Sequence, residues 1–187
     1  MKQELRNHLL PLLGLFIIIS LFWFFNKVPN IEIIYLFIGL LAGSFFLDID
    51  HFIFWFFLKP NIEESRLVQS AFEKKDIKSV ISIFESTHKN HHNLIFHHYF
   101  FQVVLILISF FIFTSSNNTL IKAFLLALNI HILTDEIIDF YNDKKYLQKW
   151  LFAREGKQLS IDSLKYYILT FVILIIFFTI LLLKSRT

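Results

Sequence analysis

The sequence has no cysteine, only four glycines and only three prolines in 187 residues. The lack of cysteine excludes disulfide bonds, thiolate metal sites and cysteine nucleophiles. Charged residues make up 18% of the chain and hydrophobic residues 56%, against roughly 25% and 45 to 50% in soluble domains. This composition excludes intrinsic disorder and argues against a soluble globular protein.

Five apolar stretches of 14 to 17 residues predict membrane-spanning helices. A helix needs about 20 residues to cross a bilayer, so the shorter stretches must include flanking residues. The stretches are Leu9–Phe25, Ile31–Leu47, Tyr99–Thr114, Leu120–Leu133 and Ile168–Leu183. We therefore predict an all-α, polytopic integral membrane protein with about five transmembrane helices and a single domain over residues 1–187.

The positions of the basic residues predict the orientation of the chain. Fourteen of the 18 Lys and Arg residues lie in the N-terminal segment and in two long loops, 59–90 and 141–165, on one side of the predicted spans. Lys184 and Arg186 fall on the other side. The positive-inside rule therefore predicts a cytoplasmic (inner) membrane protein with a cytoplasmic N-terminus and cytoplasmic loops. Because this rule already accounts for the lysines, we expect no nucleic-acid partner.

Both long loops contain apolar residues at helical spacing with Lys and Glu between them. They include Leu67, Val68, Ala71 and Phe72 in the first loop, and Tyr146, Leu147, Trp150 and Leu151 in the second. The pattern predicts amphipathic helices at the membrane surface. Packing against the spans and docking on membrane lipid are both consistent with it.

Ionisable residues are energetically costly within or at the ends of membrane helices, so a functional role is expected where they cluster. The sequence contains three such clusters. Antiparallel threading places the end of the second span, the start of the third and the end of the fourth at one membrane face. The clusters are Asp48, Asp50 and His51; His88, His91, His92, His97 and His98; and His131, Asp135 and Asp139. We therefore expect the three clusters to share one site on the cytoplasmic side.

The spacing and chemistry of these residues favour a metal centre. His131 and Asp135 are four residues apart, so both project from one face of a helix. Imidazole and carboxylate ligands without sulfur suit Zn, Mn or Fe, and about seven candidate ligands fit two ions better than one. We interpret His8 as a structural residue, and Asp139 as solvated or supporting a ligand.

Three motifs give the chain a resemblance to the YdjM-like membrane-bound metal-dependent hydrolases. They are the segment Gly43 to His51, the His92-x4-His97 pair and the His131-x3-Asp135 pair. Leu47 stands where the group has Pro, and His91 or His88 could take the place of His92. The resemblance implies a divalent-metal site made by Asp48, Asp50, His51, His92, His97, His131 and Asp135.

The leading hypothesis is a hydrolase in which a metal-activated water attacks an ester or phosphoester, with a lipid or other amphipathic molecule as substrate. Asp48 or Asp135 would bridge the metals, and a carboxylate that is not a ligand, Asp50 or Asp139, would act as the base. Two further functions stay open. His88-x2-His91-His92 resembles a box of di-iron lipid desaturases and hydroxylases, and the histidines would also serve a non-enzymatic protein that binds or transports metal.

Overall fold

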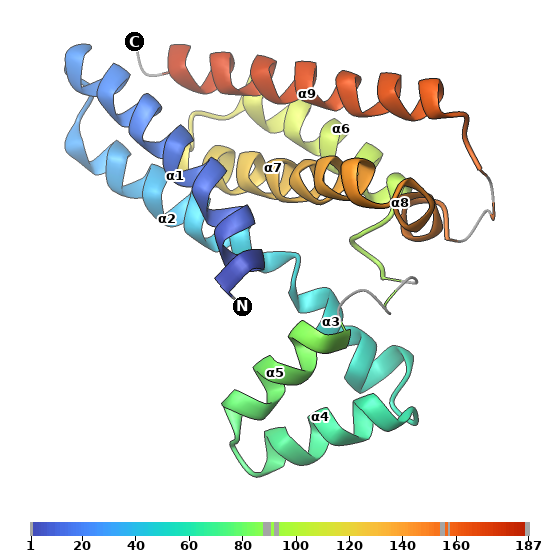
Figure 1. Cartoon of the computed structure of the whole chain (residues 1–187). Coiled ribbons are helices and arrows are strands. Elements are labelled where there is room, and N and C mark those ends of the chain that lie inside the picture. Colours follow the sequence, from blue (N-terminus) through green and yellow to red (C-terminus); the bar gives the residue numbers. More distant parts are fainter. Residues whose placement is uncertain (1, 88–90, 92–93, 154–155, 157, 186–187) are drawn as a thin grey trace.

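The computed structural model describes the chain except residues 1, 88–90, 92–93, 154–155, 157 and 186–187. Helices make up most of the described chain, and no strand occurs in it, which confirms the predicted all-α class. Five long helices form a bundle (Figure 1). They are α1 (Lys2–Phe25), α2 (Asn30–Phe46), α6 (Tyr99–Ser115), α7 (Thr119–Asn142) and α9 (Ile161–Lys184).

Helix α7 is the central helix of the bundle. Its residues Leu126, Ala127 and Ile132 are almost fully buried, and they belong to the main core together with residues of α1, α2, α6 and α9. The outer helices expose apolar side chains instead, such as Ile17 of α1 and Ile173 of α9. The bundle therefore has a packed interior and an apolar exterior, as expected for helices surrounded by lipid.

Two glycines allow α2 to lie directly against α7. A Cβ atom on Gly39 would lie 2.5 Å from the carbonyl oxygen of Leu120, and one on Gly43 would lie 2.5 Å from that of Phe124 and 2.6 Å from the Cβ of Ala127. These are closer than real Cβ contacts. Small residues four apart let membrane helices approach closely, so the spacing of Gly39 and Gly43 determines this contact.

The structure contains fewer apolar spans than the sequence predicts. Three helical segments of the described chain are long and apolar enough to cross a membrane: Arg6–Phe25, Asn30–Leu58 and Ile161–Lys184. The prediction of five spans is therefore not met by length and composition. Helix α6 has only 17 residues, and α7 carries Lys122, Asp135 and Glu136. A helix enclosed by others tolerates such residues because lipid does not contact its buried face.

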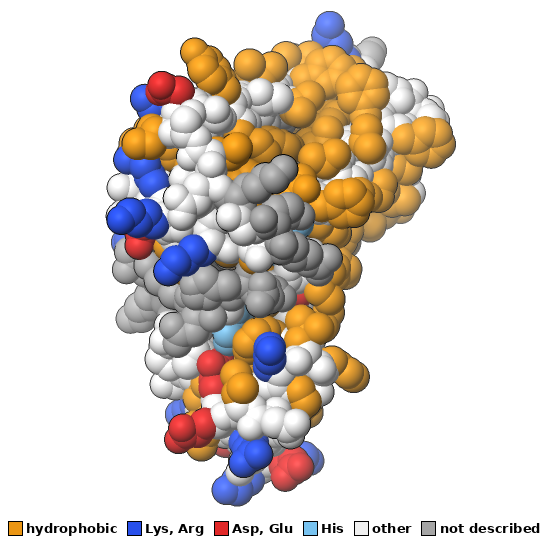
Figure 2. Space-filling view, turned by 90° about the vertical axis from the view of Figure 1, so that its right-hand side faces the viewer, with side chains coloured by type: hydrophobic (Ala, Val, Ile, Leu, Met, Phe, Trp, Pro, Cys, Tyr) orange, Lys and Arg blue, Asp and Glu red, His pale blue; other side chains and the backbone are white. Residues whose placement is uncertain are grey.

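Short helices form the rest of the molecule. The chain continues from α2 through α3 (Ile49–Ile53) and the π-helix η1 (Phe54–Leu58), and then forms a hairpin of α4 (Glu63–Glu73) and α5 (Ile77–Thr87). Helix α8 (Lys144–Leu151) follows α7. The hairpin projects from the bundle (Figure 1). Charged side chains gather over the hairpin, at the bottom of Figure 2, whereas a large hydrophobic area covers the upper right part of that view.

The predicted amphipathic segments are helical, and their apolar faces pack inside the protein. Val68 of α4 and Val80 of α5 are buried in a small core with Trp55 of η1. Leu147 and Trp150 of α8 are buried against Leu164 of α9. Leu67 and Phe72 of α4 remain exposed. Packing therefore buries much of each apolar face, whereas Leu67 and Phe72 of α4 and Ile77 of α5 remain available for other contacts.

Replacement of Gly43 by alanine tests the close contact between α2 and α7. The added methyl group forces the two backbones apart, and overpacking of this kind costs about 1–3 kcal/mol. We expect Gly43→Ala to lower the midpoint of thermal unfolding, measured by circular dichroism in detergent, by about 5 °C.

Gly14→Ala is the matched control, because nothing lies within 4 Å of a Cβ atom at that position of α1. It should leave the midpoint unchanged or raise it, since alanine favours a helix by about 1 kcal/mol over glycine. Equal shifts in the two variants would contradict the proposed role of Gly43.

Candidate metal centre

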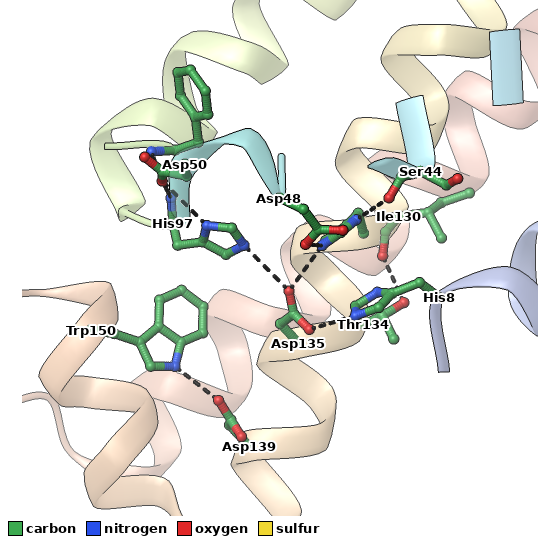
Figure 3. Close-up of polar contacts among 12 residues, drawn as sticks. His8, Ser44, Asp48, Asp50, His97, Ile130, Thr134, Asp135, Asp139 and Trp150 are labelled. Carbon is green, nitrogen blue, oxygen red and sulfur yellow. Dashed lines mark hydrogen bonds and ion pairs between the residues drawn. The ribbon is translucent and has the colours of Figure 1, made fainter. Parts of the chain in front are cut away.

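Polar residues from four parts of the chain meet at one end of the bundle (Figure 3). Asp48 lies in the turn between α2 and α3, and His97 lies just before α6. His131 and Asp135 lie one turn apart on α7, and His8 reaches the same place from α1. The end of α2, the start of α6 and the second half of α7 are thus together.

His8, His131 and Asp135 form the centre of this cluster, and one ligand atom from each lies within 4.8 Å of the others. The Nε2 atom of His8 is 3.3 Å from Asp135 Oδ1, and the Nε2 atom of His131 is 3.5 Å from Asp135 Oδ2. The two imidazole rings are stacked, with centroids 4.0 Å apart. Two nitrogens and one carboxylate therefore face a common point.

A backbone contact orients the imidazole of His131. Its Nδ1 atom is 2.8 Å from the carbonyl oxygen of Ser44, which can only accept a hydrogen bond. The Nδ1 atom therefore carries a proton, and in the neutral imidazole Nε2 has the lone pair. Metal-binding histidines are commonly fixed in this way, by donating their second ring nitrogen to a carbonyl or carboxylate.

His97 is oriented by Asp50 and points to the same centre. The Nδ1 atom of His97 is 3.4 Å from Asp50 Oδ2, and its Nε2 atom is 3.7 Å from Asp135 Oδ2. Asp50 itself is fully buried and accepts hydrogen bonds from the backbone amides of Ile95, Phe96 and His97 at 3.0, 2.6 and 3.3 Å. The Asp50 carboxylate therefore fixes the segment before α6 and the ring of His97.

Asp48 lies at the open side of the cluster. Its Oδ1 atom is 3.8 Å from His131 Nε2, and 34% of its side chain is exposed, compared with 16% for Asp135 and 1% for His131. The carboxylate edge is thus accessible, whereas the imidazole of His131 is enclosed. A small molecule would reach the cluster past Asp48.

His51 belongs to a second polar group that adjoins the first. Its Nδ1 atom is 2.7 Å from Nδ1 of His91, and the Nε2 atom of His91 is 2.7 Å from Glu64 Oε1 on α4. Trp55 Nε1 and Thr87 Oγ1 also donate to Glu64 Oε1. This chain of contacts connects the α4–α5 hairpin to α3 and to the region of the cluster.

A small cavity separates the two groups. It has a volume of about 20 Å³ and is lined by His51, His91, Leu94, His97, Asp135, Tyr146 and Trp150. A space of roughly this size holds one water molecule or one ion. The cavity therefore leaves room for one small species beside the His8, His131 and Asp135 group.

Several residues that the sequence singled out lie elsewhere. His92 and His88 lie outside the described residues. His91 contacts His51 and Glu64, and His98 accepts a hydrogen bond from the Phe100 amide at the start of α6, so both have local roles. Asp139 accepts a hydrogen bond from Trp150 Nε1 at 2.9 Å and holds α8 against α7.

Sequence reasoning missed two participants, His8 and Glu64. The interpretation of His8 as purely structural does not hold, since its ring stacks on His131 and contacts Asp135. Antiparallel threading places the start of the first span at the same membrane face as the three clusters. The sequence therefore did contain evidence that His8 could join them. Nothing in the sequence indicated a role for Glu64, because a glutamate on an amphipathic helix normally faces water.

The chain matches no known protein-family profile, no curated protein and no solved structure. The resemblance to the YdjM-like hydrolases therefore depends on the three sequence motifs alone.

The substitution Asp50→Asn tests whether this carboxylate has a structural role. An amide has one acceptor oxygen and places an NH₂ group against backbone N–H donors. Loss of such buried hydrogen bonds costs about 1–3 kcal/mol, so we expect the free energy of unfolding to fall by about that amount.

Asp162→Asn serves as control, because Asp162 is exposed and pairs only with Lys165 at 3.8 Å among the contacts described. Exposed pairs contribute little, so its unfolding midpoint in denaturant should stay near that of the parent. An Asp50→Asn protein as stable as the parent would speak against the structural role and would restore Asp50 as a base.

Proposed function

We propose that the protein is a membrane-embedded, metal-dependent hydrolase that acts on an ester or phosphoester of an amphipathic molecule. The convergence of His8, His131 and Asp135 carries this proposal, since their ligand atoms lie within 4.8 Å of one another. Asp48 and His97 add a second carboxylate and a third imidazole at the edge of this group.

The donors suit a divalent metal such as zinc, manganese or iron. Nitrogen and oxygen ligands without sulfur are typical of these ions. The hydrogen bond to Ser44 leaves the Nε2 atom of His131 available as a ligand. The Nδ1 atom of His8 is buried and has no hydrogen-bond partner within the described chain, although a buried polar atom normally has one.

The residues around the centre would have different roles in hydrolysis. A divalent metal held there would lower the pKa of a water molecule toward about 7 and polarise the substrate. Asp135, with oxygens facing both His8 and His131, would hold the metal. Asp48 is the most exposed carboxylate of the group and would accept the proton of the attacking water. This proposal gives Asp48 the role of base, which the sequence suggested for Asp50 or Asp139.

A second ion has a place in the adjoining cavity. Its lining includes the imidazoles of His51, His91 and His97 and reaches Asp135, which would then lie between two ions. Paired ions of this kind stabilise both the attacking and the leaving oxygen of a displaced ester. We therefore extend the proposal to one or two ions.

We also propose that all five long helices lie in the cytoplasmic membrane with the metal centre near the cytoplasmic surface. The charged residues Lys122 and Glu136 of α7 are 2% and 0% exposed, so neither faces lipid. The N-terminus, the hairpin and α8 lie toward the end of the bundle that holds the cluster (Figure 1). The N-terminal segment and the two loops that contain the hairpin and α8 carry 14 of the 18 Lys and Arg residues, as the positive-inside rule requires of the cytoplasmic side.

Elemental analysis of the detergent-purified protein tests the metal centre. We expect a stoichiometric divalent metal in the parent and less than about a tenth of it in His131→Ala, because loss of even a supporting residue reduces metal affinity by 10- to 100-fold. His8→Ala should also lose metal, which the sequence motifs alone do not predict.

His98→Asn is the control for these variants, since asparagine retains the capping of α6 and His98 lies outside the cluster. It should keep the metal content of the parent. A parent protein without metal, or His131→Ala with full metal content, would refute the centre.

Hydrolysis of p-nitrophenyl butyrate and bis-p-nitrophenyl phosphate tests the activity. We expect EDTA to abolish turnover, zinc or manganese to restore it, and Asp135→Asn to lower kcat/KM by at least about 100-fold, since the metal supplies most of the barrier reduction. Oxygen-dependent turnover with iron alone would favour a di-iron oxidoreductase. Metal flux through reconstituted protein without hydrolysis would favour transport, and either result would contradict the proposal.

A further inference from the structure

An apolar groove between α1 and α2 leads away from the metal centre. Its floor is formed by the buried side chains of Leu12 and Leu40, and its rims by Leu13, Phe37 and Leu41, which are 41–45% exposed. The enclosed part of the groove has a volume of about 30 Å³. The groove is therefore a shallow channel on the outside of the bundle, open along its length.

One end of the groove lies at the metal centre. Ser44 lines this end, and its carbonyl oxygen accepts the hydrogen bond from His131 Nδ1 at 2.8 Å. On the opposite wall, His8 precedes Leu12 by four residues, so the two share one face of α1. A molecule lying in the groove with its end at Ser44 would therefore present that end to His8 and His131.

Two aromatic rings lie at the other end of the groove. Phe16 and Phe37 contact each other edge to face, with centroids 5.5 Å apart. Ser44 and Phe37 are seven residues apart on α2, which corresponds to about 10 Å of helix. An extended hydrocarbon chain of about eight carbons has this length.

The lining of the groove favours the binding of a hydrocarbon chain. Ser44 is the only residue with a polar side chain among those described along it, and its hydroxyl donates to the Leu41 carbonyl at 2.7 Å. The walls thus offer no side-chain donor to a peptide or a sugar. A linear apolar chain needs none, and its burial is favourable by about 0.8 kcal/mol per methylene.

We propose that this groove binds the acyl chain of the substrate and places its ester or phosphoester at the His8, His131 and Asp135 group. The identity of the cleaved bond rests on the proposed hydrolase function. The choice of substrate rests on the groove itself. The substrate class is accordingly a single-chain or splayed lipid with a medium-length acyl segment in the groove.

The first test is the dependence of kcat/KM on chain length, from p-nitrophenyl acetate to p-nitrophenyl dodecanoate. Full burial of a methylene gives about a fourfold gain, and burial on one side about half of that free energy. We expect kcat/KM to rise about twofold per carbon up to about eight carbons and then to level off, because the Phe16 and Phe37 rings lie at the other end of the groove.

Leu41→Trp should remove this dependence by filling the groove. Ile38→Trp is the matched control, because Ile38 is on the same helix, is 46% exposed and does not line the groove. It should keep the full dependence on chain length. A flat profile in the parent, or equal profiles in the two variants, would overturn the inference while the hydrolase function stands.

Photo-crosslinking separates the groove from the chemistry. The probe is a diazirine analogue of decanoic acid, and the protein is held in digitonin, which has no linear alkyl chain. We expect saturable labelling of α1 and α2 at the groove in the parent, in Ile38→Trp and in metal-depleted His131→Ala, and its loss in Leu41→Trp.

The two proposals fail in different ways in this experiment. Saturable labelling without any ester hydrolysis would refute the proposed function and leave an acyl-binding groove. Labelling spread over all exposed helices, or labelling that does not saturate, would refute the groove.

Discussion

The close contact between α2 and α7 is the constraint on which the candidate site depends. Gly39 and Gly43 present no side chain, so the backbone of α2 lies against Ala123 and Ala127 of α7. One residue beyond Gly43, the carbonyl of Ser44 thereby reaches the ring of His131. That single hydrogen bond sets the protonated nitrogen and directs the other toward the two carboxylates. Separation of the two helices by one methyl group would remove this alignment.

The polar residues at this end of the bundle have two kinds of role. His8, His131 and Asp135 face a common point, whereas Asp50, Asp139 and Ser44 hold other groups in place. Asp50 is the clearest example of the second kind, because three backbone amides and an imidazole surround a fully buried carboxylate. Such partners offset the cost of burying its charge, which would otherwise be several kcal/mol. The rigidity of His97 follows from this arrangement.

The position of the site relative to apolar surface is consistent with a lipid-like substrate. The accessible carboxylate of Asp48 lies at the edge of the cluster, and the groove between α1 and α2 begins at Ser44, whose carbonyl oxygen is 2.8 Å from His131 Nδ1. The polar centre and the apolar groove meet at Ser44 and at the face of α1 that bears His8. This arrangement suits a molecule with a polar head and a hydrocarbon tail. The α4–α5 hairpin connects to this region through Glu64, His91 and His51.

The sequence by itself determined the helical class, the apolar character of the chain and the grouping of His131 with Asp135, because helical periodicity and hydropathy are local properties. Antiparallel threading also predicted that Asp48, His97 and His131 would meet. Only the tertiary structure decided the rest. His8 joined the group and Asp50 became a supporting residue because ring stacking and backbone hydrogen bonds depend on how segments far apart in the chain approach each other. Fewer long apolar helices are present than predicted because α6 has only 17 residues and α7 carries Lys122, Asp135 and Glu136. The tertiary structure decided where these charged residues lie, since the neighbouring helices bury Lys122 and Glu136.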